Sequence, residues 1–463
     1  MCSNWLRLGS LFGLLTSIAI ASVAHAEATN RAYRRMRRMR SSPMPSRYRL
    51  TEPWHPRLRT ATALYLIARP EEPKQNPELK EGNKAKITGD HKAAAQSSNQ
   101  FAFDLYKRAT DLASNNFLSP ASIATSLAMI RTGARGETNK QMAQVLHLEQ
   151  PKPLVQSGFG ALNTILNTQS KNYRLNMANR LWLQSGFHFE APFLKSTLEH
   201  YRTQPGSVNF ANPEQARQTI NQWVGEQTNG KISQIISPGL LHDKIRFVLT
   251  NATYFKGTWQ YRFSKELTRE APFHDLRNRE IKVPMMNQTG AFQYGENADT
   301  QFLQLPYLGG DLSMVILLPR LFNGLPQLEK QLTAREVQKW ISAMGHADEV
   351  DIYLPKFTVT SQIGLKDVLS SMGMPLAFSD DADFSGITTE HDQKLYEAIH
   401  QAFVDVNEEG TEAAAVTGHV GGNAPGPVPQ RVVFRADHPF LCLIQHNRTG
   451  AIMFIGRVIN PNG

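Results

Sequence analysis

The pattern of apolar and polar positions changes near residue 98. From Phe101 to Leu112 apolar residues recur at the spacing of one helical face, and Ser122 is placed to cap a second, apolar helix. Later runs are rich in β-branched and aromatic residues, which predict strands. Helices precede strands without βαβ alternation or repeats, so 98–463 is predicted to be one α+β body. The predicted strands lie at 247–255, 313–318, 351–353, 432–434, 440–444 and 451–455.

The N-terminus has the pattern of an export signal. The apolar stretch 11–23 is followed by Ala24-His25-Ala26, the small-residue pattern that signal peptidase accepts. We predict a signal peptide at 1–26, and therefore a secreted, extracellular protein, or a periplasmic one in a Gram-negative bacterium; an uncleaved anchor is the alternative. Cleavage would leave Cys442 without a partner for an intrachain disulfide.

The basic charge is confined to the region before the body. Residues 1–97 hold 17 basic and 7 acidic residues, and the other 33 basic and 33 acidic residues cancel. Eight arginines between Arg31 and Arg49 are followed by repeated prolines. We predict that 27–97 is a basic, mostly disordered extension. It could bind acidic surfaces by charge, or serve only as a solvated linker.

Composition excludes several classes of protein. Of 463 residues 41% are hydrophobic and 19% charged, which is enough apolar material for a large core, and no apolar run reaches the roughly 20 residues of a membrane span. Two cysteines and scattered histidines make no metal site, and we expect no cofactor. Residues 225–231 imitate a phosphate-binding loop, but Ile232 stands where a hydroxyl is needed, so Gly230 is better explained as a helix C-cap. Without a catalytic constellation, we expect no enzyme.

The segment 408–417 is unusual because it joins acidic residues and a glycine to a run of small residues. On a strand, Thr411, Ala413, Ala415 and Thr417 would share one face, all small enough to enter a packed sheet, and Glu412 would face solvent. A surface loop of biased composition is the alternative. The part of this segment that ends at Val416 consists of Glu408, Glu409, Gly410, Thr411, Glu412, Ala413, Ala414, Ala415 and Val416.

Five further motifs accompany this segment, and together they resemble the serpin family in the family's order. In chain order they are the segments 115–123 (Asn-Asn-Phe-Leu-Ser-Pro-Ala-Ser-Ile), 251–259 (Asn-Ala-Thr-Tyr-Phe-Lys-Gly-Thr-Trp), 354–357, 382–387 and 437–440. The resemblance covers essentially all of 98–463. It implies a serpin fold, with three β-sheets, eight or nine helices and an exposed reactive loop near the C-terminus.

The resemblance also implies a mechanism. Serpins are suicide inhibitors of serine proteases: the protease cleaves the reactive loop, forms an acyl-enzyme, and is trapped when the loop inserts as a new strand of the large sheet. The expected partner is therefore a target serine protease in a covalent complex, with the serpin itself a monomer. Residues 408–416 correspond to the hinge of the loop.

Individual positions follow from the resemblance. Ser119, Ser122, Asn251 and His400 match the shutter, a polar cluster beneath the sheet. Trp259, Lys356 and Glu408 match the breach, where the loop first enters, and a Lys356–Glu408 ion pair would hold the sheet shut there.

The bond that the protease cleaves is less sharply specified. Family spacing from Glu408 reaches Ala424-Pro425, but most serine proteases refuse proline after the cut, so Asn423-Ala424 and Val420-Gly421 are alternatives. Residues 419–429 contain no lysine or arginine, which argues against trypsin-like targets and favours elastase-like or subtilisin-like ones. The competing interpretation is a non-inhibitory serpin that acts as a binding, carrier or chaperone protein.

Overall fold

The computed structural model describes residues 88–110, 113–148, 150–166, 172–390, 394–411 and 431–463. All of them belong to one unit of the chain, 84–463. The predicted signal peptide, the extension up to residue 87, the hinge positions 412–416 and the candidate cleavage sites at 420–425 lie outside the described residues.

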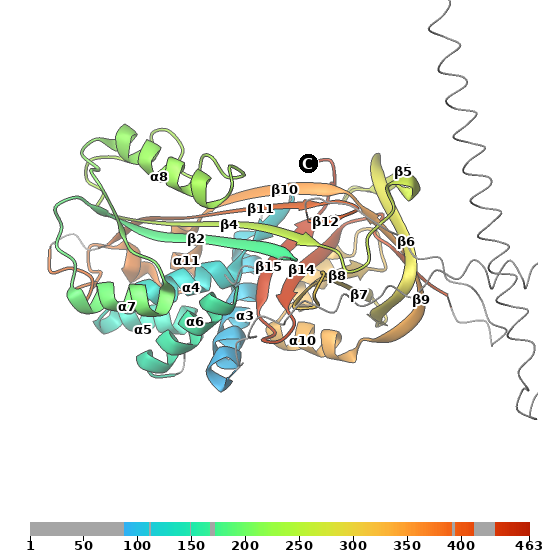
Figure 1. Cartoon of the computed structure of the whole chain (residues 1–463), viewed down its shortest axis with the longest axis horizontal. Coiled ribbons are helices and arrows are strands. Elements are labelled where there is room, and N and C mark those ends of the chain that lie inside the picture. The colour runs from blue at the N-terminus through green and yellow to red at the C-terminus, as the bar shows by residue number, and fades with distance from the viewer. Residues whose placement is uncertain (1–87, 111–112, 149, 167–171, 391–393, 412–430) are drawn as a thin grey trace, which may run out of the picture. The chain divides into compact units, whose positions relative to one another are not determined.

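One sheet contains the seam, the line along which its two central strands, Leu395–Val406 and Phe247–Thr258, pair side by side. The two central strands of this sheet run parallel, and the strands on their outer sides pair antiparallel to them (Figure 1). In spatial order its strands are β10 (Phe357–Gly364), β11 (Leu395–Val406), β4 (Phe247–Thr258), β2 (Tyr173–Gln184) and β3 (Gly206–Val208), with the short β12 (Gly410–Thr411) paired to β4.

The remaining strands form a second hydrogen-bonded path. Its long strand β6 (Glu280–Glu296) shifts its pairing register with β9 between Gly290 and Phe292, and it joins two groups of strands. The order is β1 (Asn116–Leu118), β15 (Ile452–Val458), β14 (Phe440–His446), β8 (Leu312–Pro319), β7 (Thr300–Pro306), β6, β9 (Gly345–Pro355) and β13 (Val432–Arg435), with β5 (Arg269–His274) also on β6. Each of the six predicted strands is found, and β14 and β15 form the expected hairpin.

Helices cover both faces of the first sheet. Figure 1 shows α8 (Pro213–Gln227) above it and α4 (Pro120–Arg131), α6 (Lys152–Leu166) and α7 (Ala191–Tyr201) below it. The α-helices of the described residues are α3 (Gly89–Ala109), α4 (Pro120–Arg131), α5 (Gly136–Val145), α6 (Lys152–Leu166), α7 (Ala191–Tyr201), α8 (Pro213–Gln227), α9 (Leu325–Gln331), α10 (Ala334–Ala343) and α11 (Leu365–Met372), with 3-10 turns η1 (Lys265–Leu267) and η2 (Pro375–Phe378).

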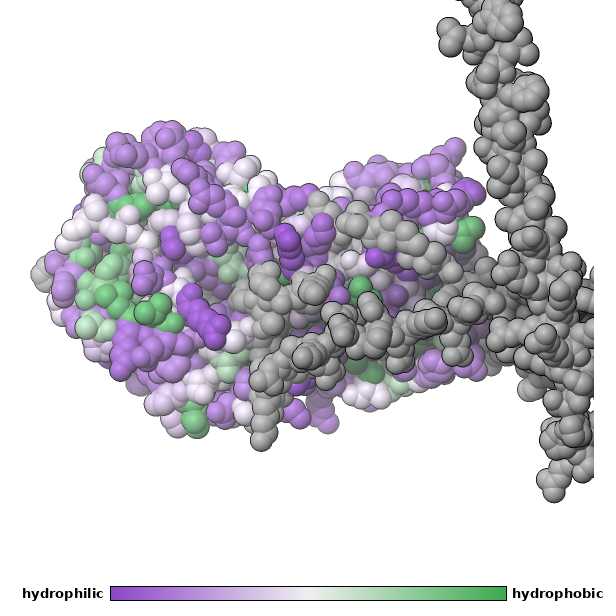
Figure 2. Space-filling model, viewed as in Figure 1, coloured by the Kyte–Doolittle hydropathy of each residue, from purple (hydrophilic) through white to green (hydrophobic). Residues whose placement is uncertain are grey.

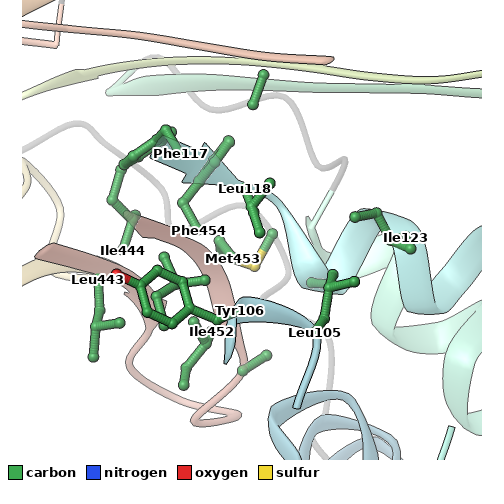
Figure 3. Packing of buried hydrophobic residues seen from close by; sticks show 14 of the residues in the cluster. Leu105, Tyr106, Phe117, Leu118, Ile123, Leu443, Ile444, Ile452, Met453 and Phe454 are labelled. Atoms are coloured by element: carbon green, nitrogen blue, oxygen red, sulfur yellow. The ribbon is translucent and has the colours of Figure 1, made fainter. Parts of the chain in front are cut away.

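The sheet separates two apolar cores because side chains alternate along its strands. In β2, Leu175 and Leu181 pack with the large core below, whereas Ala178 and Trp182 pack with the smaller core under α8. Figure 3 shows part of the large core, where Phe117 of β1 stacks on Phe454 of β15 at 5.1 Å between ring centroids. Polar side chains on the face of the sheet that packs against this core, such as Asn251 and His400, are therefore buried.

Three local features differ from or refine the sequence-based expectations. Helix α3 begins at Gly89, so 89–97 belong to the folded body and not to the predicted extension 27–97. The sequence did not indicate these first turns because they bury small side chains such as Ala94 and Ala95, which give a weak apolar signal. The expectation that Ser122 caps α4 is wrong: the helix begins at Pro120, which suits a first helical position, so Ser119 is the N-cap residue. Gly230, with φ +75°, follows α8 and its amide donates to the Gly225 carbonyl, as a helix C-terminus requires.

Candidate functional site

The seam between β11 and β4 is closed over most of its length. The two strands pair in parallel from Leu395 opposite Phe247 to Phe403 opposite Tyr254. Beyond Phe403 their registered pairing ends. There the chain turns at 407–410, and β12 pairs antiparallel with the end of β4, Gly410 opposite Thr258 and Thr411 opposite Gly257. Gly410 and Thr411, which belong to the predicted hinge 408–416, therefore form a strand on β4 at the end of the seam.

A buried polar cluster crosses the seam from below. Asn251 of β4 and His400 of β11 are register partners, both 0% exposed, and His400 Nδ1 donates to Asn251 Oδ1 at 2.6 Å. The other ring nitrogen, Nε2, accepts from the Ser119 amide at 3.1 Å, and the Ser119 hydroxyl donates to the Met453 carbonyl. Burial lowers the pKa of His400 to about 3, so its imidazole is neutral. This cluster ties both seam strands to the core beneath them.

Two members of this cluster were missed by the sequence analysis. The Asn251 amide donates to Asn179 Oδ1 at 2.6 Å and lies near the hydroxyls of Ser122 and Ser126 at 3.0 and 3.1 Å. Ser126 is one helical turn after Ser122, a spacing that could have indicated it. Asn179 is the register partner of Asn251 on β2, and no sequence motif marks it.

Beyond the last paired residues of the seam, the predicted hinge residues Glu408 and Glu409 each form an ion pair with a lysine. Lys356 Nζ lies 3.0 Å from a carboxylate oxygen of Glu408, which is 4% exposed, and the Thr268 hydroxyl donates to the same carboxylate at 2.9 Å. Burial opposes ionisation of Glu408, but a backbone hydrogen bond together with those from Lys356 and Thr268 outweighs it and holds its pKa below the ordinary value. Glu409 pairs in turn with Lys265 at 2.5 Å.

Trp259 anchors the same turn through its backbone and its ring. Its amide donates to the Glu409 carbonyl and its indole nitrogen to the Asn407 carbonyl, both at 3.0 Å. Its ring stacks on Tyr307 at 4.5 Å, a contact that the sequence analysis did not anticipate. The structure thus brings Trp259, Lys356 and Glu408 together around the start of the hinge.

Gly410 occupies a position that a side chain cannot share. Its φ is +136°, and a Cβ built there would lie 2.1 Å from the Gly257 carbonyl oxygen. The close approach of the two backbones allows β12 to pair with β4.

Other kinds of site find no support in the described part of the chain. No group of three or more His, Cys, Asp or Glu side chains there could hold a metal ion. No helix among those residues is long and apolar enough to cross a membrane. Cys442 is fully buried, and burial raises the pKa of its thiol to about 12, which leaves it unreactive.

Comparison with known proteins shows the family of this chain. A family model described as "Serpin (serine protease inhibitor)" matches residues 96–461. The chain belongs to the serpin family. A leukocyte elastase inhibitor of Bos taurus is 42% identical over 376 residues, 79% of this chain and 98% of the relative, and Serpin B3 of Homo sapiens is 38% identical over 388 residues, 79% and 99%. At the family level, serpins inhibit proteases and are generally not catalytic enzymes.

Solved serpin structures share the fold. A crystal structure of uncleaved ovalbumin superposes with a TM-score of 0.73 at 32% identity, covering 80% of this chain and all of that one. The expected serpin fold of α+β class is confirmed. Among the described residues, strand β6 pairs with β7, β9 and β5, and it thereby links two groups of strands into one continuous hydrogen-bonded path.

The expectation of a secreted or periplasmic protein is corrected by the relatives. Leukocyte elastase inhibitors are intracellular serpins, which points away from secretion. The prediction depended on the apolar run 11–23 and the small residues after it. Such a pattern depends only on the hydrophobicity and size of neighbouring residues. Residues 11–26 lie outside the described part of the chain.

Proposed function

We propose that this serpin inhibits a serine protease of elastase-like or subtilisin-like specificity by acting as a suicide substrate. The protease cleaves the loop within 420–425 and becomes joined through an ester to the new carboxyl end. Residues 411–417 and those after them then insert between β11 and β4 before water hydrolyses the ester. The product is a covalent complex of serpin and protease.

The pairing of β12 with β4 is the observation that carries this proposal. Gly410 and Thr411 run antiparallel to β4, at the point where β11 no longer pairs with it. A strand that continues in this direction separates β11 from β4 and runs antiparallel to both. Insertion would replace one parallel ladder by two antiparallel ladders, which are more stable per residue.

The free energy that insertion of the loop would release is large enough to drive the trapping of the protease. An inserted strand of about a dozen residues gains ladder hydrogen bonds at ~1 kcal/mol each, besides apolar burial. The uncleaved fold is then a kinetically trapped state of higher free energy. The cluster around Asn251 and His400 and the Lys356–Glu408 pair act as the barrier, because both must rearrange when the seam opens.

Composition of the loop and the names of the relatives support the choice of protease. Residues 419–429 lack lysine and arginine, and Val420 and Ala424 are small enough for elastase-like pockets. Several similar proteins are named leukocyte elastase inhibitor. The candidate bonds remain Val420-Gly421, Asn423-Ala424 and Ala424-Pro425.

An SDS gel with pancreatic elastase tests the proposal. We expect an SDS-stable complex and release of the peptide that begins after the cut, whose N-terminal sequence identifies the bond. Ala413→Arg should yield cleaved serpin without complex, because a bulky cation would face the packed side of the inserted strand. Ala414→Arg, on the opposite face, is the matched control and should retain more complex. Cleavage without complex in the unmodified chain, against elastase and subtilisin alike, would favour the non-inhibitory binding or carrier role.

A further inference from the structure

A cavity of about 320 Å³ lies below the first sheet, where α4, α6 and α7 pack together (Figure 1). It is lined by the end of α4, the start of α5, one turn of α6, one side of α7 and the loop that contains Gly386. Its volume is at the lower end of the range of about 300–1,000 Å³ that is usual for small-molecule sites. The proposed inhibition does not use this cavity.

Two cations share one backbone carbonyl beside the cavity. Lys152 Nζ, at the start of α6, donates to the Ala134 carbonyl at 2.7 Å. Arg135 Nη1 donates to the same oxygen at 3.0 Å and to the Thr132 carbonyl at 3.0 Å. In the described structure the side-chain hydrogen bonds of both residues thus go to neutral carbonyls and not to a carboxylate. The two positive charges are close neighbours and repel each other.

A third cation lies in the same region. Arg131 ends α4 and is 6% exposed, and its Nε is buried without a hydrogen-bond partner among the described residues. Burial, together with the charges of Arg135 and Arg131, lowers the pKa of Lys152 to about 8. The carboxylate that acts on Lys152 is that of Asp383, which accepts hydrogen bonds from the Ser385 amide and hydroxyl. Three positive charges therefore gather near one negative charge, an imbalance that a bound anion would correct.

Neutral donors and a balanced ion pair complete the lining of the cavity. The Ser196 hydroxyl of α7 is buried without a hydrogen-bond partner in the described ranges, and Gln156 of α6 adds an amide. The acidic residue of the lining, Glu199, lies one helical turn after Lys195 and 3.9 Å from its ammonium group, so these two charges offset each other. The guanidinium of Arg135 is thus left to attract an anion into the cavity.

Gly386 gives the Arg135 guanidinium its place in the lining. A Cβ at position 386 would overlap this guanidinium, so the missing side chain leaves the space that it fills. The Arg135 amide donates to the Asp383 carbonyl at 2.9 Å, which holds its backbone beside the same loop. A planar guanidinium that is fixed in this way suits an oxyanion, because its N–H groups match the spacing of phosphate oxygens.

We propose that this cavity binds a phosphate monoester with a small polar body, through the guanidinium of Arg135 and the charge of Lys152. A dianion would neutralise the two cations that share the Ala134 carbonyl. The cavity is larger than a phosphate group, and its further lining consists largely of polar side chains, which suit a hydroxylated body of sugar size. This proposal does not depend on the proposed inhibition.

Isothermal titration calorimetry of the full chain at pH 7, with glucose 6-phosphate as the probe, tests the site. Arg135→Met should weaken binding about tenfold or more and Lys152→Met about three- to tenfold, whereas Lys152→Arg should retain it. Gly386→Ala should weaken binding about threefold or more, because it displaces the Arg135 guanidinium without removing its charge. Lys140→Met, from an exposed ion pair on α5, is the matched control and should bind as the unmodified chain does.

The choice of ligand is tested in the same titration. Inorganic phosphate should bind more weakly than the ester, and glucose should not bind. Equal affinity for phosphate and the ester would show a site for the ion alone and overturn the organic body. Equal affinity of Arg135→Met, Lys152→Met and Lys140→Met would overturn the site, provided that urea unfolding shows all three variants to be folded.

An exposed apolar surface nearby provides the control for unspecific binding. Figure 2 shows apolar side chains gathered near α7, which exposes Leu194 and Leu198. A sugar phosphate has no apolar surface to place there, so Leu198→Ser should leave its affinity unchanged. Loss of binding in Leu198→Ser, with Arg135→Met unaffected, would place the ligand on this surface and overturn the cavity as its site.

Discussion

His400 and Asn251 face each other across the seam of two parallel strands and are joined by a hydrogen bond of 2.6 Å in a site without solvent. In the proposed mechanism β11 and β4 separate to admit a new strand, so this bond has to break during that insertion. Its partners give it a fixed direction: His400 donates from Nδ1 while Nε2 is occupied by the Ser119 amide. The neutral tautomer is therefore part of the closed state.

Acid should destabilise the uncleaved fold through two buried histidines. Burial lowers the pKa of His400 to about 3 and that of His446 to about 4, from an ordinary value near 6.5. Below pH 6.5 the unfolded chain binds protons that the native state does not, so the free energy of unfolding falls by about 1.4 kcal/mol per pH unit for each histidine. In urea unfolding between pH 6 and 4.5, His400→Gln and His446→Gln should each remove about that slope. A His400→Gln slope equal to that of the unmodified chain would show that His400 is not buried as a neutral group.

Asn251→Ala should lower the free energy of unfolding by about 3 kcal/mol or more. The substitution leaves His400, Asn179 and the nearby hydroxyls without their common partner in a buried site. Asn287→Ala is the matched control: this half-buried amide of β6 makes one bond, to the Ile352 carbonyl, and should cost about 1 kcal/mol. Urea unfolding at pH 7.5 measures both, and equal losses would contradict a special role of the cluster.

Lys356→Met should destabilise the top of the seam by about 1–3 kcal/mol, because it leaves the buried Glu408 carboxylate without its cation. The loss is smaller than for a fully buried pair, since the Lys356 side chain is 38% exposed. Adding Glu408→Gln should restore part of the loss, and Lys339→Met, from an exposed pair on α10, should change nothing measurable. A double variant as unstable as the sum of its single variants would exclude the ion pair as the cause.

Gly410→Ala should detach β12 from β4. A φ of +136° and a Cβ 2.1 Å from the Gly257 carbonyl oxygen leave no room for a methyl group, and the strain costs about 1–3 kcal/mol or more. Hydrogen exchange should accelerate at the amides of Trp259 and Phe263, which donate to Glu409 and Glu408. Gly345→Ala, where a Cβ meets nothing within 4 Å, is the control. Unchanged exchange in Gly410→Ala would mean that the hinge does not depend on this approach.

The sequence predicted much of this site because its motifs keep their order and type. Ser119 and His400 are 281 positions apart, yet each lies in a recognisable motif or position and the structure brings them into contact. Asn179 was not predictable in this way, because one asparagine within an ordinary strand pattern carries no local signal. Its role follows only from its register opposite Asn251.

Other expectations failed where the sequence signal was purely local. Ser122 has the chemistry of a cap, but Pro120 starts α4 earlier, and the serine hydroxyl serves the buried cluster instead. The pairing of β12 with β4 could not be foreseen either, since it depends on a turn at 407–410 held by Trp259 and Lys356 from distant parts of the chain. Tertiary contacts decide both cases.

The melting temperature before and after a single cut in the loop tests the central claim most directly. The chain is nicked within 420–425 by a catalytic amount of elastase, the cut is verified by mass spectrometry, and both forms are heated under the same conditions. If residues 411–417 and their successors enter the sheet, the nicked form should melt more than about 10 °C higher, since roughly ten new ladder bonds are gained. A nicked form that melts at the same temperature as the intact chain, with the cut ends still open to further proteolysis, would contradict strand insertion.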